Sequence, residues 1–290
     1  MPHVDAFTLE LVDRALRVAG TLLFAIAALR LVRTGRWRNP LSQIEFGGGG
    51  PTLAHLVGVT AIFYLILFVG TQASGIDSEA MKTPGSRDWH VARCIEDGAE
   101  VVASILIVVI LRRCGAPYRG AVGCRTGIWT VLSVGGTGVL IILAITNVQL
   151  QAGQVVWHWL QPEAQQPIHS VLEALEHTAW GTWGTVQLTI AAIIIAPLAE
   201  ELFFRGLLLQ TLWGYTGHAW PAIALSGVAF GLIHNQQPQD VLPLATMGAI
   251  LGYVRVRYRS LPACMLIHAL FNGRTMLFVL LCPEAARIGW

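Results

Sequence analysis

Three charged residues lie inside one of the most apolar stretches of this 290-residue chain. Glu200, Glu201 and Arg205 are flanked by the apolar runs 193–199 and 206–209. A charged side chain at the centre of a membrane helix costs about 2.5–3.5 kcal/mol on insertion scales. Leucine anchors a helix in lipid without that cost, so an ionisable cluster at this depth indicates a functional site.

The spacing within the cluster assigns different tasks to its two glutamates. Glu201 and Arg205 are four residues apart, so on a helix they share one face and can form an ion pair. Glu200 lies about 100° round the helix from Glu201, because an α-helix has 3.6 residues per turn. We therefore expect a structural pair, Glu201 with Arg205, and a chemically available carboxylate, Glu200.

Three more polar residues have a similarly apolar setting. His234 closes one apolar run, and His268 and Asn272 lie four residues apart in the last one. A buried carboxylate is a better base than one at the surface, and beside an imidazole it can take a proton from water. An imidazole and an amide on one helical face can donate hydrogen bonds to an oxyanion. Together these groups could hydrolyse an amide with an activated water.

Other hydrolytic designs find no support in the sequence. It contains no GxSxG or HExxH motif and no pair of aspartates within the apolar runs. The five cysteines include no CxxC pair and no zinc-ribbon spacing, so we expect unpaired thiols. A covalent nucleophile is therefore not indicated.

At this point the sequence resembles a known family, the CAAX prenyl protease and bacteriocin-processing (CPBP) family, also called the Abi family. The resemblance covers about residues 183–281 and rests on three motifs in the family's order. They are Glu200-Glu201-x-x-x-Arg205, Phe230-x-x-x-His234 and His268-x-x-x-Asn272. The first motif alone is weak, since soluble helices often contain it, but three in order within apolar sequence are specific.

The resemblance implies a role for each of these residues. Glu200 would be the general base, and His234 would help to hold and activate the water. His268 and Asn272 would stabilise the tetrahedral oxyanion, while Glu201 and Arg205 would hold the geometry of the site. The resemblance leaves open whether the reaction uses a metal ion. We favour water activation without a cofactor, but one Glu and two His form a credible zinc set, with Glu200, His234 and His268 as ligands.

The composition places this chemistry in a membrane. Hydrophobic residues make up 54% of the chain and charged residues 12%, against about 25% charged residues in soluble domains. The chain is therefore expected to be an integral membrane protein. Its formal net charge of +2 gives no reason to expect a nucleic-acid partner.

The apolar runs predict an all-α fold, a polytopic transmembrane helical bundle of about eight spans. Backbone groups in lipid must be satisfied within their own segment, so each run should be a helix. We expect two parts: 1–182, with about four spans and an outer loop of unknown role, and 183–290, a catalytic transmembrane core. The runs lie near 15–32, 53–72, 98–112, 127–149, 183–204, 219–234, 241–254 and 261–281.

Three local features lead to further expectations. Pro197 should kink the fifth helix one turn before the glutamates. Simple alternation of spans puts Glu200 and His234 at different depths, unless the fifth helix continues to about residue 213 and His234 also comes inward. Residues 169–177 contain His169, Glu173 and His177 at helical spacing, which fits an interfacial amphipathic helix better than a metal site.

The sequence thus favours an intramembrane endopeptidase that acts on a peptide, or on a protein with a membrane-associated tail, in the lipid bilayer. Prenylated CAAX tails are what the best-known relatives cleave. A non-catalytic scaffold or bacteriocin-immunity protein of the same fold is the alternative, and a transporter is disfavoured because no internal repeat is visible. The Trp- and Arg-rich, Lys-poor composition suggests a bacterial plasma membrane.

Overall fold

The computed structural model describes residues 6–35, 41, 49–77, 79–114, 127–161, 169–176, 178–235 and 238–282. In these ranges the protein is helical and contains no strand, so the all-α prediction is confirmed. A helix is found at each of the eight expected runs. These helices are α1 (Ala6–Arg33), α2 (Leu53–Ser74), α3 (Arg87–Arg113), α5 (Ile128–Leu160), the segment α7 to α9 (Thr182–Thr216), α10 (Ala219–Leu232), α11 (Val241–Tyr258) and α12 (Leu261–Leu281).

Five of these helical segments are long and apolar enough to cross a membrane, among the residues described: α1, α2, α5, the 182–216 segment and α12. The other three fall short for different reasons. Helix α10 has only 14 residues. Helices α3 and α11 are less apolar because they carry charged residues. By length and composition alone, the described part of the chain therefore does not show all eight expected spans.

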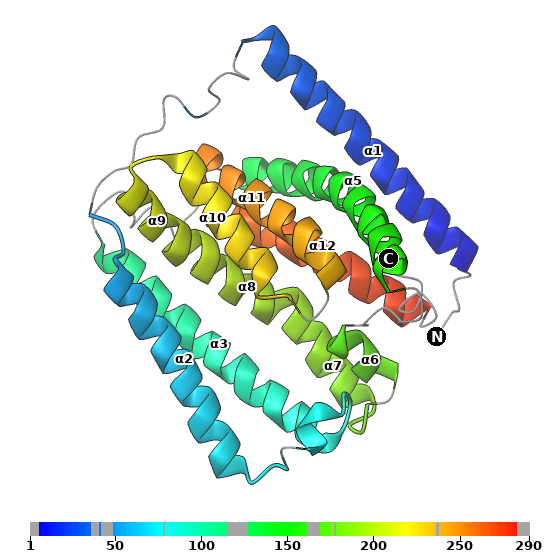
Figure 1. Cartoon of the computed structure of the whole chain (residues 1–290), viewed down its shortest axis with the longest axis vertical. Helices are drawn as coiled ribbons and strands as arrows, with labels where there is room; N and C mark the ends of the chain where they lie inside the picture. Colours follow the sequence, from blue (N-terminus) through cyan, green and yellow to red (C-terminus); the bar gives the residue numbers. More distant parts are fainter. Residues whose placement is uncertain are drawn as a thin grey trace.

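The helices pack in pairs around a central group (Figure 1). Helix α2 runs beside α3, and α10 beside α11. The long 182–216 segment runs between the α2–α3 pair and the group of α10, α11 and α12, and it contacts α3, α10 and α12. Helix α1 lies against α5 at the periphery.

Glycines bring α10 and α11 into backbone contact. Gly227 and Gly231 are four residues apart, the small-xxx-small spacing of close helix pairs in membranes. A Cβ on Gly231 would lie 2.4 Å from the Val241 carbonyl oxygen, and one on Gly227 would lie 2.7 Å from the Ala249 nitrogen. Any side chain at either position would therefore force the two helices apart.

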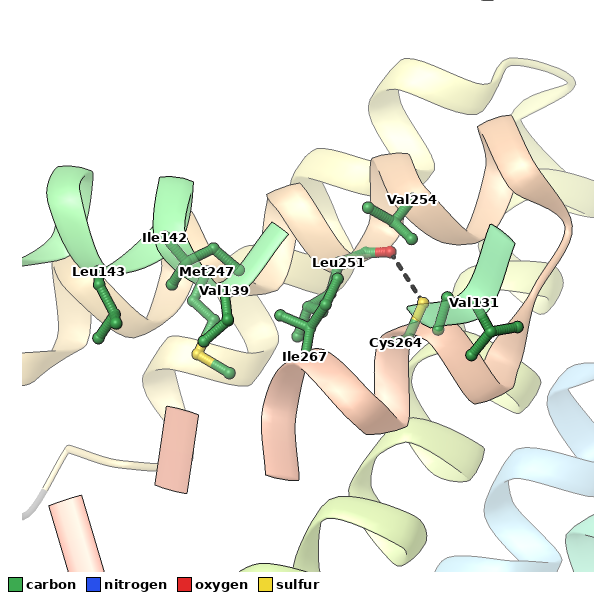
Figure 2. Packing of buried hydrophobic residues seen from close by; sticks show 10 residues of the cluster. Val131, Val139, Ile142, Leu143, Met247, Leu251, Val254, Cys264 and Ile267 are labelled. Atoms are coloured by element: carbon green, nitrogen blue, oxygen red, sulfur yellow. Dashed lines mark hydrogen bonds between the residues drawn. The ribbon is translucent and has the colours of Figure 1, made fainter. Parts of the chain in front are cut away.

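The largest hydrophobic cluster joins α5 to α11 and α12 (Figure 2). Its centre is dry and close-packed: Ile142, Leu251 and Ile267 are all fully buried. The Cys264 thiol lies in the same cluster and donates to the Leu251 carbonyl at 3.4 Å. This cluster fixes the position of α12, which carries His268 and Asn272.

A second cluster joins the first part of the chain to the glutamate-bearing helix. Ile107 and Leu111 of α3 pack with Leu202 and Leu207, and with Leu261 at the start of α12. Both clusters therefore contain residues from each side of position 182. The division into 1–182 and 183–290 stays a prediction about function, since hydrophobic contacts cross it.

The 182–216 segment is a continuous helix with two π-helical stretches between its α-helical parts. It consists of α7 (Thr182–Ile190), the π-helix η3 (Ala191–Ile195), α8 (Ala196–Glu201), the π-helix η4 (Leu202–Leu208) and α9 (Leu209–Thr216). The irregularity expected at Pro197 therefore takes the form of the π-helix η3 just before it. Because the helix continues to Thr216, Glu200 lies near its middle, which removes part of the predicted difference in depth.

A helix is present at the expected place, α6 (Ser170–Glu176), and its location at a membrane interface stays a prediction. Its Ala174 is fully buried against Trp89 of α3 and Leu188 of α7. Of the three residues at helical spacing, His177 lies outside the described residues.

Candidate active site

The buried ion pair predicted from the sequence is present. An Arg205 Nη1 donates to Glu201 Oε1 at 2.8 Å, and both side chains are fully buried. Arg205 also donates to the Gly248 carbonyl of α11 at 3.2 Å. Its guanidinium lies 4.5 Å from the ring centroid of Phe230 on α10. Arg205 therefore ties the glutamate-bearing helix to α10 and α11.

The His268 ring lies between the two neighbouring glutamates. Its Nδ1 donates to Glu201 Oε1 at 3.0 Å. Its Nε2 lies 3.9 Å from Glu200 Oε2, too far for a hydrogen bond but close enough for a strong electrostatic interaction. From the sequence, Arg205 was the only partner predicted for Glu201. The bond by which Glu201 also orients His268 was not predicted.

Glu200 is the less constrained of the two carboxylates. Its side chain is 21% exposed, whereas that of Glu201 is fully buried. Glu200 Oε2 is itself shielded and accepts no hydrogen bond in the structure. A buried carboxylate oxygen without a donor is costly, so this atom is well placed to accept a hydrogen bond from water or substrate.

His234 reaches the site from the turn that follows α10. Its Nδ1 donates to the Phe230 carbonyl at 2.9 Å, which leaves Nε2 as an acceptor in the neutral ring. The Phe230 ring centroid lies 5.1 Å from that of His234 and 5.6 Å from that of His268. Residues of all three motifs thus contact Phe230.

Asp240 lies close enough to His234 for their charges to interact. It sits in the turn between α10 and α11, where burial raises the pKa of its carboxyl to about 6 and the nearby His234 partly opposes that shift. This acidic neighbour of His234 was not predicted from the sequence.

Asn272 has a structural partner that explains its position. Ala196 N–H bonds to the Ala191 carbonyl in the π-helix η3, and Pro197 has no N–H to offer the next carbonyl. The Ala192 carbonyl is therefore left without a helical donor. Asn272 Nδ2 donates to it at 2.9 Å. An amide carries two N–H groups, so Asn272 retains a second donor beyond this bond.

A further carboxyl group on α3, not predicted from the sequence, belongs to Glu100. Glu100 lies close enough to Glu200 for the two carboxyls to interact electrostatically, and it interacts in turn with Asp97 and Arg93. Arg93, Asp97 and Glu100 are spaced i, i+4 and i+7, which places them on one face of α3. That spacing at the start of an apolar run is the sequence signal that could have identified them.

The zinc alternative concerns Glu200, His234 and His268. Among the described residues, no three His, Cys, Asp or Glu side chains are grouped closely enough to hold a metal ion. Each of the two rings uses Nδ1 in a hydrogen bond, so the Nε2 atoms are the ones that could bind a metal, as in many zinc-binding histidines. Zinc therefore stays the alternative to a metal-free reaction.

Fold and site together define a class: an integral membrane protein of α-helices with a carboxylate–imidazole site among its helices. Residues 182–274 match the family model of Rce1-like type II CAAX prenyl endopeptidases. The resemblance expected for about residues 183–281 is thereby confirmed over this segment. This segment is therefore similar to a family described as prenyl endopeptidases.

One curated relative extends the comparison without adding an activity. The chain is similar to the UPF0177 protein YaiF of Lactococcus lactis subsp. lactis, with 36% identity over 90 residues. That alignment covers 31% of this chain and 38% of the relative. The chain thus matches little more than a third of the relative's length. No solved structure matches the chain.

Proposed function

We propose that the protein is an intramembrane endopeptidase that hydrolyses a peptide bond in a membrane-associated protein or peptide. The observation that carries the proposal is the position of Glu200. Its carboxylate has an unpaired oxygen and lies 3.9 Å from His268 Nε2, within a segment that matches a prenyl endopeptidase family.

Glu200 acts as the general base. The unpaired Oε2 accepts a hydrogen bond from a water molecule and takes its proton as the water oxygen attacks the scissile carbonyl. His234 holds this water through Nε2, since its Nδ1 is already bonded to the Phe230 carbonyl. General base catalysis of this kind contributes about 10²–10⁴-fold to the rate.

His268 stabilises the oxyanion that forms on the carbonyl oxygen. Glu201 accepts from Nδ1 and so fixes the ring, as a carboxylate does for the histidine of a hydrolytic triad. To donate from Nε2 as well, the ring must carry a proton on both nitrogens. Asn272 adds its second amide N–H to the same oxyanion.

The proposed reaction needs no metal ion, because the base, the water and the oxyanion donors are all supplied by side chains. A zinc-dependent variant remains the competing mechanism. The two are separated by measuring hydrolysis after dialysis against a chelator and after zinc is restored: full activity in the chelator supports our mechanism, and recovery only with zinc contradicts it.

The substrate class follows from the family. Rce1-like proteins are described as prenyl endopeptidases, so a peptide with a prenylated cysteine near its C-terminus is the first probe. The bacterial plasma membrane is the location we propose, in line with the composition and the bacterial source of the relative.

The test compares the wild-type protein with Glu200→Gln. Purified protein in lipid vesicles is incubated with a farnesylated CAAX peptide, and the terminal peptides of the host membrane proteome are mapped with each variant. We expect Glu200→Gln to express normally and to lose cleavage by about 10²-fold or more. Glu173→Gln, an exposed glutamate on α6, is the matched control and should retain it.

If Glu200→Gln leaves every biological effect of the protein intact, the enzyme proposal fails. The non-catalytic scaffold or immunity protein would then be the better description, since binding does not require this base.

A further inference from the structure

We propose that the site is entered from the side of the membrane away from the cytoplasm, and that its substrate is a peptide segment on that side. This inference rests on the proposed function, and it specifies where the water and the peptide come from. Two features of the molecule support it: the charges at the helix ends, and the length of the hairpin that α10 and α11 form.

Arginines gather at one end of the bundle. The last turns of three helices, α1, α3 and α11, each carry two of them: Arg30, Arg33, Arg112, Arg113, Arg255 and Arg257. These three helices run in the same direction, so their last turns lie at the same end of the molecule (Figure 1). The stretches of sequence around these arginines, 18–44, 101–126 and 241–283, contain no Asp or Glu.

The opposite end of the bundle has a different charge pattern. Four of its positive side chains pair with nearby carboxylates: Arg14 with Glu10, Arg17 with Asp13, Lys82 with Glu79, and Arg93 with Glu96. The connections that follow α5 and α10 at this end, 161–181 and 233–240, contain no Lys or Arg. Connections rich in Lys and Arg stay in the cytoplasm. The arginine end is therefore the cytoplasmic end.

The α10–α11 hairpin is too short to cross a membrane from that end. Helix α10 has 14 residues and α11 has 18. At 1.5 Å per residue these helices are about 21 and 27 Å long, whereas the hydrocarbon core of a bilayer is about 30 Å thick. Figure 1 shows the hairpin ending near the middle of the bundle, while α3 and α7 extend farther. The turn that carries His234 therefore lies at membrane depth.

A turn at this depth faces water rather than lipid. Irregular backbone is not found exposed to lipid, because its N–H and C=O groups would lack partners there; it is either buried in protein or lines a water-filled cavity. This turn is not buried, since Asn235 and Pro238 are exposed. From His234 to Asp240, six of its seven residues are polar. Water therefore reaches His234 at the turn.

Apolar packing closes the site toward the cytoplasmic end. Leu207 follows Glu200 by about two helical turns in that direction. On α12, Leu261 precedes His268 by the same distance. Both leucines are buried and pack in one cluster with Leu111 of α3. Glu200 itself is 21% exposed. Water and substrate therefore reach Glu200 from the side of the α10–α11 turn.

The side of entry restricts the substrate. A peptide bond that reaches Glu200 past this turn belongs to a segment that has crossed the membrane or is attached to its outer leaflet. A prenylated tail in the cytoplasm would meet the end that Leu207 and Leu261 close. In the cell, the substrate is therefore a peptide segment outside the cytoplasm.

Labelling of engineered thiols tests the orientation of the site. Asn235→Cys places a thiol in the turn beside His234, and Thr34→Cys places one just beyond Arg33 at the arginine end; both positions are exposed. Intact spheroplasts that express each variant are treated with a membrane-impermeant maleimide, and peptide mass spectrometry distinguishes the new thiol from the native cysteines. We expect Asn235→Cys to react, and Thr34→Cys to react only after the membrane is permeabilised.

Cleavage is then measured in membrane vesicles of defined orientation. The probe is a farnesylated CAAX peptide coupled to dextran, which keeps the peptide on the side to which it is added. We expect right-side-out vesicles to cleave it, and inverted vesicles to cleave it only after detergent is added. Glu200→Gln in the same vesicles is the control, because any cleavage that remains with this variant comes from another enzyme.

Gln161→Cys, at the exposed C-cap of α5, is a second reporter for the outer side should Asn235→Cys fail to fold. Reaction of these two thiols only after permeabilisation would overturn the inference, whether or not the protein is active. Cleavage by intact inverted vesicles would also overturn it and would leave the proposed function standing. If wild-type and Glu200→Gln membranes cleave equally even in detergent, the proposed function fails, and the labelling pattern alone decides the orientation.

Discussion

Two adjacent glutamates have different surroundings because a helix turns by about 100° per residue. Glu201 faces Arg205 and His268 and has no exposed surface. Glu200 faces α3 and His268 and keeps an unpaired oxygen. The spacing of charges in the sequence was sufficient to predict that Glu201 would pair and that Glu200 would remain available.

Substitutions at these positions should therefore separate folding from chemistry. Removing one partner of a buried ion pair leaves an uncompensated charge and costs about 3–5 kcal/mol. We expect Glu201→Ala and Arg205→Ala to lower the yield of monodisperse protein, whereas Glu200→Gln should be purified at the wild-type level. Size-exclusion chromatography of fluorescently tagged variants measures this. Equal yields for all three would contradict the division of roles.

The partners of His268 could not be predicted in the same way. Its bond to Glu201 joins residues 67 positions apart. Which faces of α8 and α12 meet depends on how both helices rotate, and that is set by clusters that include α5 and α3. Periodicity along a single helix contains no information about this rotation.

Pro197 changes the local hydrogen-bond pattern of the helix that carries the two glutamates. The sequence indicated that the helix would be irregular there, since a proline removes one donor. It did not indicate a π-helix, because the choice between a kink and a wider turn depends on which neighbour can satisfy the freed carbonyl. Here Asn272 of α12 satisfies the Ala192 carbonyl, and π-helical turns are frequent at functional sites.

A double-mutant cycle should show that Pro197 and Asn272 are coupled. Asn272→Ala leaves the Ala192 carbonyl without a donor, a loss of about 1–3 kcal/mol for a buried group. In a Pro197→Ala background, the new N–H of residue 197 can bond to that carbonyl, so the same substitution should be less destabilising. Thermal unfolding in detergent measures both. Equal destabilisation in the two backgrounds would show that the carbonyl does not depend on Asn272.

For the whole molecule, the sequence predicted the eight helices and the membrane setting, because apolar runs report directly on both. It did not predict how the helices pack. The contact between α1 and α12 illustrates why: Arg274 Nε donates to Asp13 Oδ1 at 2.9 Å, across 261 positions of the chain. Neither residue was singled out from the sequence: Asp13 lies among other charged residues before the first apolar run, and Arg274 is a single charge within the last one.

This ion pair should hold α1 on the bundle. Apart from Asp13, only Leu9 and Gly20 of α1 are buried. Asp13 is fully buried and also pairs with Arg17 at 3.0 Å, so it serves two arginines. Asp13→Ala would leave Arg274 without its partner, at a cost of about 3–5 kcal/mol. We expect a clear drop in melting temperature, measured in detergent.

The double variant Asp13→Ala with Arg274→Met should recover much of that loss, because replacing both charges with apolar side chains is often close to neutral. Recovery would show that Asp13→Ala destabilises the protein mainly because it leaves the charge of Arg274 without a partner. If the double variant melts as low as Asp13→Ala, then α1 is held by the ion pair itself. If Asp13→Ala melts as the wild type does, the pair does not secure α1, and its contact with α5 through Gly20 is sufficient.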